Sequence, residues 1–185
     1  MSVVGTLPIA ICATLLISAG GAVADQNDTR LNELFAIIAQ VEHQRVSAEV
    51  EQQIWEIWLS HEDDGIEARL AAGVTAMNHD PRLAFNILTE LTEEVPDFAE
   101  AWNKRATLYY LLGDYAASHS DILRTLELEP RHFGALSGLG LVHLALGQYV
   151  EAITAFEGVL RVHPQSKAAQ DNIDKINRHL RRQAI

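Results

Sequence analysis

The sequence carries an internal repeat of 34 residues, and this period limits what the chain can fold into more than any other feature. Pro96, Pro130 and Pro164 stand at this interval, and the residues around the last two keep the same register. The Leu-Gly-Asp-Tyr segment at 112–115, for example, corresponds to Leu-Gly-Gln-Tyr at 146–149. Repeats of this length are typical of solenoids, in which each unit buries its apolar face against its neighbours.

Apolar residues inside the unit have helical spacing. Trp102, Ala106, Tyr109 and Leu112 recur every three or four residues, which places them on one face of a helix. Gly113 then ends this helix, because glycine adopts the left-handed conformation of a helix terminus without steric cost. Residues that must allow close helix contact are small at equivalent positions of both units, namely Ala106, Ser118, Gly140 and Ala152. Each unit is therefore predicted to form two packed helices.

These residues resemble the consensus of the tetratricopeptide repeat (TPR) family. The resemblance covers three repeats, at 65–98, 99–132 and 133–166, and the first is degenerate because Asn-His-Asp-Pro replaces its turn. It implies an all-α TPR helical solenoid of about nine helices, with an N-terminal helical pair in 25–64 that caps the degenerate repeat. The segment 167–185 is predicted to form a C-terminal capping helix, since its apolar edge opposes a charged face. The whole chain also resembles small periplasmic TPR proteins of Gram-negative bacteria.

The first 24 residues contain no charged side chain and end in Ala22-Val23-Ala24, the small-x-small pattern of a signal-peptidase site. We therefore predict that 1–24 is a signal peptide, that cleavage precedes Asp25, and that the protein is periplasmic. The alternative is an uncleaved inner-membrane anchor, since the segment is long enough to span a bilayer. Cys12 lies in this segment, so the mature chain would have no thiol for a disulfide, a metal site or nucleophilic catalysis.

The charge distribution disfavours nucleic-acid binding. The net charge is −11, and residues 25–160 hold 23 acidic against 8 basic side chains. Such a surface repels phosphate backbones. Residues 161–185 instead hold 6 basic against 2 acidic side chains. We attribute this basic end to compensation of the helix dipole at the C-terminus. Membrane contact is expected only through the N-terminal segment, if that segment is not cleaved.

No motif in the sequence predicts catalysis, a metal or a cofactor. The eight histidines show no HExxH or HxH spacing. The segment 61–64 (His-Glu-Asp-Asp) is interpreted as a solvated acidic turn, because no later glutamate completes a calcium loop. The segment 118–121 (Ser-His-Ser-Asp) has the letters of a catalytic triad, but side chains adjacent on one helix point in different directions and cannot converge.

The resemblance implies that a partner binds the concave face, which the first helix of each TPR lines. The residues at the lining positions are mostly uncharged; those selected as the candidate site are Asn103, Lys104, Thr107, Tyr110, Leu111, Gly134, Ser137, Gly138, Leu141 and Leu144. The basic and Asn pattern of the carboxylate clamp is not reproduced, because the third repeat offers no basic partner. Such a groove suits a helix or an extended peptide.

The predicted function is that of a non-catalytic adaptor or scaffold in the bacterial cell envelope, with a protein or peptide partner. The alternatives are a self-associating structural subunit and a membrane-anchored assembly factor. Trp55 and Trp58 leave a second question open, since they could anchor a partner or form core that covers the first repeat.

Overall fold

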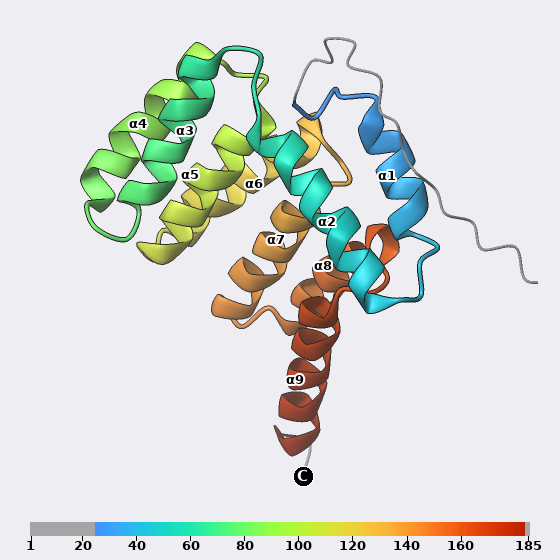
Figure 1. Ribbon diagram of the computed structural model, residues 1–185. Coiled ribbons are helices and arrows are strands. Elements are labelled where there is room, and N and C mark those ends of the chain that lie inside the picture. The colour runs from blue at the N-terminus through green and yellow to red at the C-terminus, as the bar shows by residue number, and fades with distance from the viewer. Residues whose placement is uncertain (1–24, 184–185) are drawn as a thin grey trace, which may run out of the picture.

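The computed structural model describes residues 25–183, and within them all regular elements are α-helices (Figure 1). The prediction of a signal peptide falls on residues 1–24, which lie outside the described residues. The helices in chain order are α1 (Arg30–Ile38), α2 (Gln44–Leu59), α3 (Asp64–Ala76), α4 (Pro81–Glu94), α5 (Ala99–Leu111), α6 (Tyr115–Leu128), α7 (Phe133–Ala145), α8 (Tyr149–Val162) and α9 (Lys167–Gln183).

Helices α3–α4, α5–α6 and α7–α8 form three hairpins that follow one another along the solenoid (Figure 1). Gly113 and Gly147 sit at the turns of the last two hairpins with positive φ angles of 80° and 72°. The first hairpin forms without such a glycine. Its turn closes because the Asp80 side chain accepts a hydrogen bond from the Leu83 amide, while Pro81 begins α4. The degenerate sequence at 78–81 thus still encodes a helix–turn–helix unit.

The paired helices approach closely at the small residues that the repeat alignment selected. In the second repeat, the Ser118 hydroxyl donates to the Ala106 carbonyl at 2.8 Å across the hairpin. In the third repeat, a β-carbon on Gly140 would lie 2.7 Å from the Phe156 ring, and Ala152 is fully buried. The predicted close-approach positions are confirmed.

The N-terminal pair does not cap the degenerate repeat, and that prediction was wrong. The arm, as we call α1 and α2 together, shares its core with the other end of the solenoid: Phe35, Ile54 and Trp58 are buried with Phe133 of α7 and Phe156 of α8. The core of the first repeat contains no arm residue and is closed by α3, α4 and α5, through side chains such as Leu70 and Leu88. The arm thus folds back over the third repeat (Figure 1).

The two ends of the solenoid differ in how much apolar area they leave uncovered, and this difference explains where the arm docks. Helix α3 turns its large apolar side chains, such as Ile66 and Leu70, into its own hairpin core. The positions that it leaves exposed hold Glu67, Ala68 and Ala72, which present little apolar area. Helix α7 instead presents Phe133, Leu141 and Leu144 to the arm cluster. Burial of apolar area drives docking, so the arm is stabilised at α7.

Helix α9 follows the last hairpin and buries Ala169, Ile173 and Ile176 in the same cluster as the arm. Its last turn carries Arg181 and Arg182, where cations complement the helix dipole. No helix within residues 25–183 combines the length and apolar content that a membrane span requires.

Candidate functional site on the concave face

The first helices of the three hairpins line one face of the solenoid, and α2 runs across this face in front of α7 (Figure 1). Helix α2 also contacts α5. The concave surface is consequently divided into a section under α2 and an open section beyond it. The two sections have different chemistry.

Two tryptophans anchor α2 in the covered section. The Trp58 ring stacks on the His132 ring, with centroids 4.0 Å apart and planes 9° from parallel, and is almost fully buried. Trp55 fits against Gly134, where a β-carbon would lie 2.5 Å from its Cη2 atom. The ammonium of Lys104 lies 5.1 Å from the Trp55 ring centroid, close enough for a cation–π contact. Trp58 is therefore a core residue, as one of the two hypotheses stated. The core that it joins is that of the third repeat, however, and not that of the first.

A buried polar cluster joins α5 to α7 beneath these tryptophans. Glu100 is 1% exposed, and its Oε2 accepts from His132 Nε2 and from the Asn103 amide, each at 2.9 Å. Lys104 pairs with the other carboxylate oxygen. His132 Nδ1 accepts the Ala135 amide at the start of α7, so Nε2 carries the proton that is donated to Glu100. The cluster thereby fixes the ring on which Trp58 stacks.

The pKa of Glu100 reflects the balance between burial and these partners. Burial by itself would raise the pKa, because desolvation penalises the carboxylate. The hydrogen bond from His132 and the positive charge of Lys104 outweigh burial and hold the pKa of Glu100 below its ordinary value. The carboxylate therefore stays ionised and holds Lys104 in place.

Three further contacts hold the rest of the arm. Ser47 of α2 is hydrogen-bonded to His163 Nε2 at 3.0 Å, and both are buried. Arg131 lies over the Phe35 ring of α1 at 4.4 Å. Ahead of α1, Gln26 accepts a hydrogen bond from the Ala99 amide at the start of α5, at 3.1 Å. The arm is thus held at both ends and along α2.

The open section lies between α5 and α7 and adjoins the tryptophan contacts at Gly134. It holds a small pocket of about 60 Å³ that six of the predicted residues line: Asn103, Thr107, Tyr110, Gly134, Gly138 and Leu141. Pockets for small ligands generally measure about 300–1,000 Å³, so this one suits a single protruding side chain of a larger partner. Leu111, which follows the lining residue Tyr110 at the end of α5, is 59% exposed.

The ten predicted residues have different surroundings. All of them except Asn103 are at least partly exposed, including Leu111 and Ser137, which do not line the pocket. Lys104 and Gly134 contact Trp55, and Asn103 belongs to the buried cluster around Glu100. Leu141 and Leu144 pack against the core that the arm shares. Sequence reasoning missed His132 as a site residue, since nothing in the repeat pattern signals that a tryptophan stacks on it.

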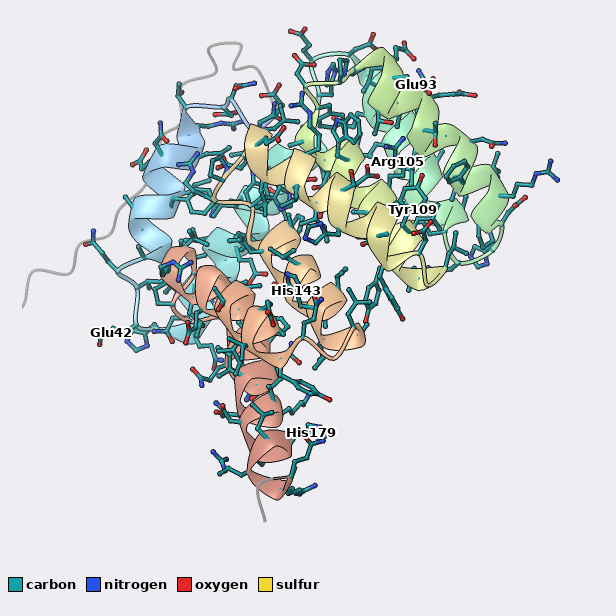
Figure 2. All side chains as sticks on the ribbon, turned by 180° about the vertical axis from the view of Figure 1, so that it is seen from behind. Glu42, Glu93, Arg105, Tyr109, His143 and His179 are labelled. Atoms are coloured by element: carbon teal, nitrogen blue, oxygen red, sulfur yellow. The ribbon has the colours of Figure 1, made fainter. Side chains whose placement is uncertain are left out.

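The convex back of the solenoid, which faces the viewer in Figure 2, differs from the concave face in its contacts. Arg105 lies between α4 and α6, where it forms a two-pronged ion pair with Asp121 at 2.7 and 2.9 Å and donates to Thr92. A hollow of about 360 Å³ between α7 and α8 is lined by Leu136, Leu139, His143, Val150, Glu151, Thr154, Ala155, Gly158 and Arg161. Because this hollow lies on the convex back, a substitution in it can serve as a control for substitutions on the concave face.

The motifs that the sequence analysis set aside have structural roles. Asp63 accepts from the Gly65 amide at the start of α3, and the His61 ring lies 5.1 Å from that of Phe98. Within 118–121, Ser118 bonds Ala106 while Asp121 pairs with Arg105, so the two side chains serve different neighbours. In residues 25–183 no three metal-ligating side chains gather at one point.

Comparison with known proteins agrees with this architecture. The tetratricopeptide repeat family matches residues 104–169. A TPR repeat-containing protein of Rhizobium etli is 40% identical over 93 residues, which is 50% of this chain and 46% of that protein. A Homo sapiens SGT1 homolog is 31% identical over 80 residues, or 43% of this chain and 22% of that protein. The chain thus spans less than half the length of either relative.

Solved structures share the fold. The first TPR of Spaghetti (RPAP3), bound to an HSP90 peptide, superposes with a TM-score of 0.59 at 23% identity, covering 62% of this chain and 92% of that one. MamA superposes with a TM-score of 0.58 at 23% identity, covering 62% and 67%. Together with the 34-residue period and the three hairpins, these matches show that the chain contains tetratricopeptide repeats.

Proposed function

We propose that this protein is a non-catalytic adaptor or scaffold that binds a segment of a partner protein on the open section of its concave face. The observation that carries the proposal is the pocket between α5 and α7, together with the exposed apolar side chain of Leu111 on α5. The side chains around this pocket are small, polar without charge, or apolar, so affinity would come mainly from buried apolar area. TPR structures with a similar fold support a peptide partner, since that of Spaghetti (RPAP3) is bound to an HSP90 peptide.

The contacts of Lys104 argue against recognition of a partner's carboxylate. A carboxylate clamp needs a basic side chain that is free to meet the ligand, but the ammonium of Lys104 pairs with Glu100 and lies over Trp55. Release of this lysine would leave the buried Glu100 carboxylate without its cation, which is costly. The partner that fits the open section is therefore an apolar helix or extended strand, whose binding depends only weakly on salt.

We place this activity in the periplasm, as a component of the cell envelope, on the basis of the uncharged segment 1–24 and its small-residue end. Recovery of a chain that begins at Asp25 from the periplasmic fraction supports this location. A full-length chain in the membrane pellet supports the inner-membrane anchor and the membrane-anchored assembly factor instead. A self-associating subunit is distinguished by its mass in light scattering, which would rise with concentration, whereas an adaptor would keep the mass of a monomer.

The test of the binding face is affinity capture from the envelope fraction. The double variant Tyr110→Ala with Leu111→Glu alters the open section while leaving the arm and its core untouched, and we expect it to lose the captured partner. The matched control is Val150→Glu, which places the same charge in the convex hollow on a side chain that is 71% exposed. Circular dichroism should show equal helicity for all chains. Capture that survives in the groove variant and fails in the control would move the binding site to the back.

A further inference from the structure

The covered section of the concave face is a shaped seat for a helix, and α2 occupies it. We infer that this seat is itself a binding surface for an amphipathic helix with tryptophans at positions i and i+3, and that a partner helix of this chemistry displaces α2. The inference rests on the proposed function, because it extends the binding face from the open section to the section under the arm.

The seat is specific for an indole at one position. Gly134 leaves a notch in α7, and the Cη2 atom of Trp55 enters it so closely that a β-carbon there would lie at 2.5 Å. Any larger residue at this position would have to displace the Trp55 ring, so the glycine and the indole fit each other. The ammonium of Lys104 lies over the ring of the same indole. A helix of any origin that carries a tryptophan in this register would meet the same surface.

The second tryptophan, Trp58, is well packed but incompletely hydrogen-bonded. It is 1% exposed and stacks on His132, yet within residues 25–183 its buried indole Nε1 has no hydrogen-bond partner. Buried donors in native proteins almost always find an acceptor, so the seat accommodates the aromatic ring of α2 better than its N–H group. A partner helix whose second tryptophan has an acceptor for its own indole N–H would therefore bind the seat better than α2 does.

The arm is connected in a way that permits exchange. Residues 60–63, which are partly or fully exposed, form its only covalent link to the repeats. The cores of the first two hairpins contain no arm residue, so these hairpins keep their packing when α2 leaves. The polar contacts at the edge of the seat, such as that of Ser47 with His163, are single hydrogen bonds that a partner side chain can replace.

The test uses a fluorescent peptide of residues 44–59 and the chain from Asp25 onward. Fluorescence anisotropy gives the affinity of the peptide for the wild type and for Trp55→Ala, in which the arm has lost the indole that enters the notch. The wild-type arm competes from the same chain at a high effective concentration, so we expect weak peptide binding to it. We expect at least tenfold tighter binding to Trp55→Ala, because the notch is then empty.

Two glycine variants show whether the peptide uses the notch. In the Trp55→Ala background, Gly134→Ala fills the notch with a methyl group and should remove the tenfold gain. Gly138→Ala, one turn further along α7, meets only the flexible end of Ile122 at 3.3 Å and should keep the gain. Equal binding to the wild type and Trp55→Ala, or a gain that survives Gly134→Ala, would overturn the inference. Trp55→Phe repeats the comparison if Trp55→Ala proves unfolded by circular dichroism.

This assay contains no cellular partner, so its outcome is separate from that of the capture experiment. Failure of the peptide to bind leaves the open section as the binding face. Capture that survives the Tyr110→Ala, Leu111→Glu variant would overturn the open section as the binding face, and would not affect the outcome of the peptide assay.

Discussion

The α5–α6 and α7–α8 hairpins share a sequence register but are stabilised and used differently. Position by position, Arg105 and Asp121 in the first correspond to Leu139 and Ala155 in the second. The first hairpin thus holds a buried ion pair where the second holds apolar side chains. At another shared position, Glu100 forms a buried polar cluster while Gly134 leaves a notch for Trp55.

This difference shows that the repeat pattern specifies the fold of the hairpin but not the side chains on its outer surfaces. Both hairpins keep the small close-approach residues and the glycine of the turn, because backbone geometry requires them. The side chains that face outward from the hairpin are under no such constraint. In this chain they have diverged into a polar, open hairpin and an apolar hairpin that the arm covers.

The largest effect should come from breaking the ion pair of the first of these hairpins. Asp121→Ala leaves Arg105 partly buried without its carboxylate, and we expect a loss of about 3 kcal/mol in the free energy of unfolding. The double variant Arg105→Leu with Asp121→Ala copies the Leu139 and Ala155 arrangement and should recover most of this loss. Urea unfolding followed by circular dichroism measures both. If the double variant is as unstable as the single one, the two hairpins are not interchangeable at this site.

The close-approach position should give the next largest effect. Gly140→Leu drives a side chain into the Phe156 ring, which lies 2.7 Å from the position of a β-carbon, and should destabilise the protein by about 1–3 kcal/mol. As a control, Glu157→Gln changes an exposed residue of α8 and should stay within about 0.5 kcal/mol. Coincident urea midpoints for the two variants would contradict the assigned register.

The smallest effect should be the pH dependence of arm docking. Burial lowers the pKa of His163 below its ordinary value of 6.5, although the nearby Glu51 partly opposes this shift. The folded chain therefore favours the neutral ring, so His163 stabilises the fold above about pH 6.5. This contribution is lost as the pH falls through the lowered pKa. Amide exchange in α2 should accordingly accelerate as the pH falls from 7 to 5, after correction for intrinsic exchange.

His163→Gln provides the comparison for this measurement. Glutamine keeps a polar partner for Ser47 but does not titrate, so the corrected exchange of α2 should change less between pH 7 and 5 than in the wild type. Glu100 acts in a lower window, since its pKa lies below the ordinary value of 4.5 and its contribution is lost only as the pH falls through that lowered value. An equal pH response of α2 in both chains would exclude His163 as the group responsible.

The sequence by itself determined the hairpins. The 34-residue period, the small residues at Ala106 and Gly140, and the glycines of the turns all act within one unit or between adjacent units. Their spacing can therefore be read directly from the chain. The resemblance to the TPR family implied that Tyr110, Leu111 and Gly138 line the concave face, and all three are at least partly exposed.

Only the tertiary structure decided where the arm docks, and therefore which part of the concave face is open. The contact between Ser47 and His163 joins residues 116 apart in the sequence, and the stacking of Trp58 on His132 likewise crosses four helices. These contacts occur once and follow no period, so spacing could not reveal them. The outcome depended on which end of the solenoid left more apolar area uncovered, a property of the folded surface.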